Sequence, residues 1–93
     1  MSTSSQRLKY SRIYRQLTQA DAAEKAGITR QSVTMYETTN RDPGFKTGMV
    51  LCKVYNVTPS FIAFGDATNE DEKDIEAVIR LSEKMLVKVR KTK

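Results

Sequence analysis

Ninety-three residues leave room for one domain with a single hydrophobic core. The formal net charge of +5 suits both solubility and binding to a polyanion. The chain has no histidine and a single cysteine, Cys52, which excludes a disulfide within the chain and the usual His and Cys spacings of metal sites. It also has no glycine-rich phosphate loop and no nucleophile beside a plausible base. We therefore expect a protein that is not an enzyme and needs no cofactor.

The chain carries no signal for a membrane or for export. No apolar run approaches the roughly 18 residues of a membrane span, and the first ten residues lack the apolar segment of a signal peptide. We therefore expect no membrane partner and a cytoplasmic location.

The first predicted helix runs from about Ser5 to Arg15. Leu8 and Ile13 are expected to face the core, with Arg7, Lys9 and Arg15 outside. These cations could neutralise the phosphates of a polyanion or be merely solvated. Lys9 is our candidate for a phosphate contact.

Residues 17–38 predict two short helices separated by a tight turn. Thr18 can cap the first helix, with Asp21 three positions later completing a capping box. Gly27 ends that helix, because glycine adopts a left-handed conformation without a Cβ penalty. Thr29 can cap a second helix that runs to about Thr38. Helices joined by so short a turn must cross steeply, and small alanines on the first permit close approach: Ala22, Ala23 and Ala26.

The second of these helices has an outward face suited to DNA bases. At 100° per residue, one arc of roughly 140° holds five side chains: Arg30, Gln31, Thr34, Met35 and Thr38. Arginine can bond guanine, glutamine can bond adenine, and threonine or methionine methyl groups can contact thymine. Such residues also occur on ordinary solvated helices, but their position on the second helix of a helix-turn-helix favours DNA recognition.

Two further helices are predicted after Pro43. One runs from about Phe45 to Tyr55, and we expect it to bury Phe45, Leu51, Cys52 and Tyr55. Thr58 can cap the next helix, which ends at Gly65. Its apolar residues are expected in the core: Phe61, Ile62 and Phe64.

The chain divides into a domain of residues 1–65 and a connector with a C-terminal helix in residues 66–93. The first part holds nine Lys or Arg against four acids, whereas the second holds seven of each, so the positive excess lies in the first part. Asn69 can cap the last helix, which begins with acidic residues and ends with basic ones. Its apolar residues recur at helical spacing and form our candidate dimerisation surface: Ile75, Val78, Ile79, Met85, Leu86 and Val89. Folding back onto residues 1–65 is the alternative, and dimerisation is favoured because an exposed apolar stripe this long would need a partner.

Residues 5–65 resemble the DNA-binding domain of the phage repressor and Cro family, also called Xre-like regulators. The likeness includes residues of the helix-turn-helix and of its flanking helices at matching separations. The matching residues are Leu8, Arg12, Leu17-Thr18-Gln19, Ala23, Gly27-Ile28-Thr29, Val33, Tyr36-Glu37, Pro43, Leu51, Val57 and Phe61 to Gly65. The resemblance implies an all-α, five-helix, lambda-repressor-like domain, to which this chain adds a C-terminal amphipathic helix.

The resemblance also implies roles for residues outside the arc. Gln19 would bond a DNA phosphate, and Arg12 and Glu37 would form a structural ion pair. Asn40 and Arg41 would lie along the DNA backbone. Asp42 departs from the family, in which basic residues are commoner in that loop.

The resemblance implies a transcriptional regulator of a bacterial or phage-infected cell, associated with the nucleoid. Its partner would be a double-stranded DNA operator with an inverted repeat, bound by a homodimer. Repression is the family's commonest outcome, and nothing in the residues separates it from activation. The alternative is an antitoxin-like protein, whose C-terminal helix would bind a protein partner while the helix-turn-helix regulates its own gene.

Overall fold

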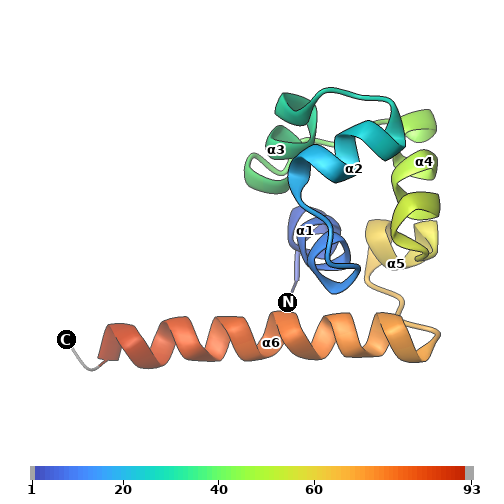
Figure 1. Cartoon of the computed structure of the whole chain (residues 1–93). Helices are drawn as coiled ribbons and strands as arrows, with labels where there is room; N and C mark the ends of the chain where they lie inside the picture. Colours follow the sequence, from blue (N-terminus) through green and yellow to red (C-terminus); the bar gives the residue numbers. More distant parts are fainter. Residues whose placement is uncertain (1, 92–93) are drawn as a thin grey trace.

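The computed structural model describes the backbone of residues 2–91 and the side chains of residues 2–84. Within that range the chain is all-α, which confirms the predicted fold class (Figure 1). The helices are α1 Ser4–Tyr14, α2 Gln19–Ala26, α3 Arg30–Thr38, α4 Phe45–Tyr55, α5 Pro59–Phe64 and α6 Glu70–Lys91. In Figure 1, α2 and α3 lie on one side of α1 and α6 on the other. No helix among the described residues is both long and apolar enough to cross a membrane.

Threonine side chains begin several of the helices, as the sequence predicts. The capping box at the start of α2 is formed, with Asp21 N donating to Thr18 Oγ1 and Thr18 N donating to Asp21 Oδ2, both at 3.0 Å. Thr29 and Thr58 cap α3 and α5 in the same manner through their side-chain oxygens. Gly27 ends α2 with a φ of +70°, a conformation that favours glycine. Local sequence therefore sets these helix boundaries.

One hydrophobic core joins the helices, and it differs from the predicted core at three positions. Leu8, Leu51 and Phe61 are buried as expected. Phe45, however, is 84% exposed and Phe64 is 79% exposed, and Ile13 is also exposed. Phe45 is the first residue of α4, Phe64 is the last of α5, and Ile13 lies in the last turn of α1. Helix ends reach past the neighbouring helices, so an apolar residue there stays outside even when the periodicity points inward.

Arg7 is buried, although the sequence predicts it on the outside. Its Nε donates to the carbonyl oxygen of Ile62 at 3.0 Å, and its Nη1 donates to the carbonyl oxygen of Ser2 at 2.7 Å. The Ser2 hydroxyl in turn donates to Glu76 at 2.7 Å. Burial lowers the pKa of the Arg7 guanidinium, an effect that the charge of Glu76 opposes. Arg7 thus joins α1 to the end of α5 and, through Ser2, to α6.

The first half of α6 is part of the same core. Ile75 and Ile79 are buried in the cluster that contains Leu8 and Phe61, and α6 packs against α1. The core therefore continues past residue 65, where the sequence predicts the end of the domain. The expectation that Ile75 and Ile79 lie on an exposed dimerisation surface is wrong, because their own chain already covers them. Val78 is exposed, and the remaining side chains of the predicted set lie outside the described residues: Met85, Leu86 and Val89.

The start of α6 is tied to α5 by a buried carboxylate. Glu72 Oε2 accepts bonds from the backbone N and the hydroxyl of Thr58 at 2.7 and 2.8 Å. Its Oε1 accepts from the backbone N and the hydroxyl of Thr68 at 3.0 and 3.2 Å. Burial alone raises the pKa of the Glu72 carboxyl, but these four bonds outweigh burial and hold the pKa below its usual value. The ionised form is therefore the one that stabilises the fold.

We predict that Glu72→Gln lowers the free energy of unfolding at pH 7 by about 1–3 kcal/mol, because an amide cannot accept all four bonds. Because the folded-state pKa of Glu72 is depressed, its contribution is full above the unfolded pKa of about 4.3 and is lost as pH falls through the folded value. Urea unfolding at several pH values should show the two proteins converging below that range. Glu70→Gln, at an exposed position of the same turn, is the control, and an equal loss in both variants would contradict the prediction.

Candidate DNA-binding surface

The turn between α2 and α3 is short and closely packed. Ile28 N donates to Ala23 O at 3.0 Å and Gly27 N donates to Glu24 O at 3.3 Å, so the chain reverses immediately after α2. Ala22 and Ala23 are buried, and their small side chains let α3 and α4 pack against α2. The steep crossing expected of these two helices is thus built into their sequence.

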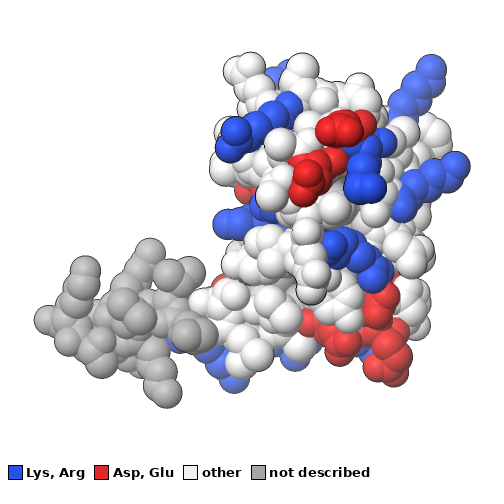
Figure 2. Space-filling model, in the orientation of Figure 1, with Lys and Arg blue, Asp and Glu red and all other residues white. Residues whose placement is uncertain are grey.

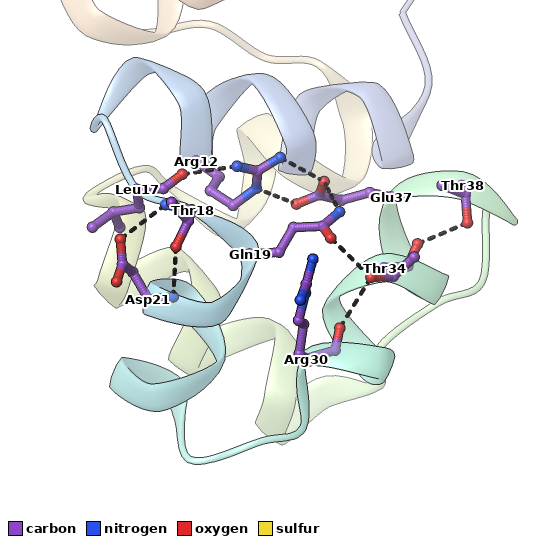
Figure 3. A network of polar contacts seen from close by, with 9 residues as sticks. All are labelled: Arg12, Leu17, Thr18, Gln19, Asp21, Arg30, Thr34, Glu37 and Thr38. Atoms are coloured by element: carbon purple, nitrogen blue, oxygen red, sulfur yellow. Dashed lines mark hydrogen bonds and ion pairs between the residues drawn. The ribbon is translucent and has the colours of Figure 1, made fainter.

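A buried ion pair holds α3 against α1. Arg12 Nε donates to Glu37 Oε2 at 2.7 Å and Arg12 Nη2 donates to Glu37 Oε1 at 2.9 Å, a two-bond arrangement (Figure 3). Arg12 Nη1 donates to the carbonyl oxygen of Leu17, which fixes the segment before α2. Hydrogen bonding to Glu37 raises the pKa of Arg12 by more than burial lowers it. The ion pair expected from the resemblance is thus formed, and it links three parts of the chain.

Gln19, the first residue of α2, extends this pair into a network. Its Nε2 donates to Glu37 Oε1 at 3.2 Å, and its Oε1 accepts from Thr34 Oγ1 at 2.9 Å (Figure 3). The side chain expected to bond a phosphate is therefore half-buried and engaged within the chain. A carboxamide has two N–H donors, so one remains for another partner. The sequence pattern does not predict this link, because only the crossing of α2 and α3 brings the first residue of one beside the fifth residue of the other.

The predicted base-contacting residues fall into two groups. Arg30, Gln31 and Thr38 are exposed, whereas Thr34 and Met35 are partly buried. Thr34 Oγ1 also lies 3.1 Å from the carbonyl oxygen of Arg30, and Thr38 Oγ1 donates to the carbonyl oxygen of Thr34 at 2.7 Å. Both threonine hydroxyl hydrogens are thus used inside the protein, leaving the oxygen lone pairs and the methyl groups for outside contacts. Beside this face, on the side of Arg30, Val33 and Glu37 are buried.

The residues expected along the DNA backbone lie in α1 and in the loop after α3. Lys9 is exposed, with its Nζ 5.7 Å from the centre of the Tyr10 ring. Asn40 and Arg41 are exposed, and Asn40 has a φ of +56°. The Asn40 side-chain oxygen accepts from the Ser5 hydroxyl at 3.2 Å, which ties the loop to α1.

Asp42 is the acidic residue of the loop between α3 and α4. Asp42 Oδ1 accepts from Gly44 N at 2.8 Å, a turn that brings the chain into α4. The acid that departs from the family pattern in this loop therefore has a structural role. Figure 2 shows acidic side chains gathered over the first turns of α6 and a second acidic group in the region of α2, with Lys and Arg side chains spread around both.

Known proteins are similar to this chain in sequence. A helix-turn-helix family model matches residues 8–62, more than half of the chain. The chain is 33% identical over 66 residues to YqaE, an uncharacterized HTH-type transcriptional regulator of Bacillus subtilis, with 71% of this chain and 57% of the relative covered. It is 31% identical over 84 residues to the HTH-type transcriptional regulator DicA of Escherichia coli, with 90% of this chain and 62% of the relative covered. The chain thus spans about three fifths of the length of these two relatives.

A third relative is an uncharacterized HTH-type transcriptional regulator of Methanocaldococcus jannaschii. It is 37% identical over 51 residues, which cover 55% of this chain and 77% of the relative. The residues that match the family model run from Leu8 in α1 to Ile62 in α5 and include the whole of α2 and α3. This chain therefore belongs to the helix-turn-helix family of Xre-like transcriptional regulators.

Proposed function

We propose that this protein binds a specific double-stranded DNA operator as a dimer and represses transcription there. The observation that carries the proposal is the exposed face of α3 in front of a buried polar network. Arg30, Gln31 and Thr38 face solvent, while Glu37 on the same helix is fixed by Arg12. A side chain on a rigid helix loses less conformational freedom on binding than one on a loop, which favours base recognition.

Each exposed residue of α3 has a base that it can recognise. We assign Arg30 to the O6 and N7 atoms of a guanine and Gln31 to the N6 and N7 atoms of an adenine. Thr34, Met35 and Thr38 would contact thymine methyl groups, because the two threonine hydroxyl hydrogens are already bonded within the chain. Specificity would then depend chiefly on the two long polar side chains at the start of α3.

The phosphate contacts would come from elements on either side of α3. Lys9 and Arg41 would neutralise phosphates, and Asn40 would hydrogen-bond one. Gln19 keeps one amide hydrogen for a phosphate while the other bonds Glu37. Such a contact would connect the DNA backbone directly to the network that fixes α3.

We place this protein in the cytoplasm of a bacterial cell. There, binding of the protein to its operator would repress transcription. A dimer with both copies of α3 in successive major grooves would cover a site of about two helical turns and exclude RNA polymerase from an overlapping promoter. The similarity to the E. coli regulator DicA, which covers 90% of this chain, supports transcription control as the outcome. The partner required for binding is then a second copy of the chain.

Selection of bound fragments from random DNA should return an inverted repeat. We expect half-sites centred about 10–10.5 base pairs apart, because two copies of α3 must enter adjacent major grooves on one side of the duplex. Recovery of unrelated sequences, with equal affinity for the pool before and after selection, would reject sequence-specific binding.

The selected site then separates base contacts from phosphate contacts. Arg30→Ala should cost about 1–3 kcal/mol on that site and relax the preference at one base pair in each half-site. Lys9→Ala should weaken binding to all sequences alike and reduce the slope of log affinity against log salt by about one for each phosphate that is no longer neutralised. Fluorescence anisotropy at several salt concentrations measures both effects. Equal losses on selected and random DNA for both variants would show that α3 does not contact the bases as assigned.

The ion pair beneath α3 should behave as a buried pair. Glu37→Leu leaves the Arg12 guanidinium without its carboxylate, and we expect the free energy of unfolding to fall by about 3–5 kcal/mol. Adding Arg12→Met to that variant should restore at least half of the loss, since the unpaired charge is then removed. Urea unfolding of the wild type, both single variants and the double variant forms a complete cycle. Losses that simply add would contradict coupling between the two residues.

A further inference from the structure

The loop between α3 and α4, residues 39–44, carries two of the proposed phosphate contacts but has little packing to hold it. Every residue of this loop is exposed except Pro43, which is partly buried. A groove of about 510 Å³ is lined by the loop on one side and by α1, α4 and α5 on the others, with Leu8 and Ile62 among its walls. Gly48 leaves this space open, since the nearest atom that a Cβ there would meet is Pro43 Cγ, at 3.8 Å. Apolar burial therefore does not fix the position of the loop.

A side chain of α1 holds the loop instead. The Ser5 hydroxyl donates to the side-chain oxygen of Asn40 at 3.2 Å, and Ser5 itself is only 7% exposed. Among the described residues, this is the only hydrogen bond that joins the loop to a helix other than α3 and α4, which flank it. The bond suits the backbone, because Asn40 has a φ of +56°, a left-handed conformation that asparagine adopts more readily than most residues. The chain is thus tied to the start of α1 where it turns away from α3.

This attachment continues the one made by the buried ion pair. Arg12 follows Ser5 by seven residues, or about two helical turns, so the two side chains leave α1 on nearly the same side. Their partners, Glu37 and Asn40, are three residues apart. Arg12 therefore fixes the last part of α3, and Ser5 fixes the loop that follows it.

The Ser5 bond leaves donors free around the loop. With its oxygen occupied by the hydroxyl, the Asn40 amide keeps two N–H donors, and neither donates to another described residue. Arg41 is the next residue and is exposed. Lys9 is exposed one turn after Ser5, so its side chain leaves α1 on nearly the same side. An amide and two cations are therefore placed near one bond, a combination suited to the DNA backbone.

We propose that Ser5 is a positioning residue for DNA binding, whose bond to Asn40 holds the loop so that Asn40 and Arg41 meet the DNA backbone while α3 lies in the major groove. The proposal rests on the proposed function and adds a buried residue that does not itself touch DNA. A loop already tied to α1 loses less conformational freedom on binding than a free one. Removing the hydroxyl should therefore weaken binding to every sequence alike, since phosphates carry no base information.

A second serine of α1 provides a matched control. Ser11 is also buried, and its hydroxyl has no hydrogen-bond partner among the described residues. Ser5→Ala and Ser11→Ala thus remove the same group from the same helix, but only the first breaks a contact with the loop. We expect Ser5→Ala to raise the Kd for a random-sequence duplex about threefold to tenfold, and Ser11→Ala to leave it within about 1.5-fold.

Salt dependence separates positioning from a loss of stability. If the loop is released, Arg41 no longer neutralises a phosphate, so the slope of log affinity against log salt should fall by as much as about one in Ser5→Ala. A merely structural role for Ser5 would lower the free energy of unfolding in urea but leave the slope and the Kd of the folded protein unchanged. A Kd and slope that match those of Ser11→Ala would overturn the proposal.

A double-variant cycle tests the bond itself. Asn40→Gly removes the side chain but accepts the left-handed backbone, and it should weaken DNA binding in its own right. In that background Ser5→Ala should change the Kd by less than about 1.5-fold, because the hydroxyl has already lost its partner. Losses that multiply independently would show that Ser5 does not act through Asn40, and the proposal would be wrong.

NMR relaxation of the free protein gives a readout that needs no DNA. The heteronuclear NOE of the Arg41 amide should fall in Ser5→Ala but not in Ser11→Ala, because the released loop moves on the picosecond-to-nanosecond timescale. An unchanged NOE in both variants would contradict the positioning role.

The positioning role and the proposed function can fail separately. A chain that shows the Arg30→Ala effect on selected DNA, but no difference between the two serine variants, would refute only the role of Ser5. A chain that binds neither selected nor random DNA would refute the proposed function, and the phosphate role of the loop with it, whatever the NOE shows.

Discussion

The buried pair of Arg12 and Glu37 is the interaction on which the DNA-binding surface depends. It joins the last turn of α1 to the inner side of α3, and Gln19 brings the start of α2 into the same network. Charged groups with little solvent access are stable only when both partners stay together, so the helices that carry them have one favourable arrangement. This fixes the rotation of α3 about its axis. The rotation in turn decides which side chains face outward.

Buried polar contacts also fix α6, on the side of α1 opposite α2 and α3. Glu72, at the start of α6, accepts bonds from Thr58 and Thr68, and Arg7 bonds the end of α5 and the N-terminal segment. Together with Ile75 and Ile79 these contacts attach the first half of α6 firmly to the helices that carry α3. The first half of α6 and the helices that carry α3 are therefore one packed body.

Prediction from the sequence succeeds where the structure is local and fails where burial depends on distant neighbours. Thr18, Gly27 and Thr29 act within three or four residues, and their roles at helix ends follow from spacing alone. Phe45 and Phe64 lie outside the core and Arg7 lies inside it, against expectation, because nothing in a helix's own sequence records which other helix ends nearby. For the same reason the periodicity of α6 does not show which of its apolar residues are buried. Periodicity detects that a helix has an apolar side, but not how much of that side packs against the core.

Residue type and spacing are enough to establish that the chain is all-α, where most of its helices begin and end, and that the second helix of a helix-turn-helix carries DNA-compatible side chains. Helix formation and helix ends depend on hydrogen bonds between residues that are close together in the sequence. The packing of the helices was needed to show that Gln19 and Thr34 meet, and that Ile75 lies in the core while Leu81 is left outside. Burial and cross-helix contacts depend on how helices far apart along the chain cross one another, and a one-dimensional pattern does not specify those crossings.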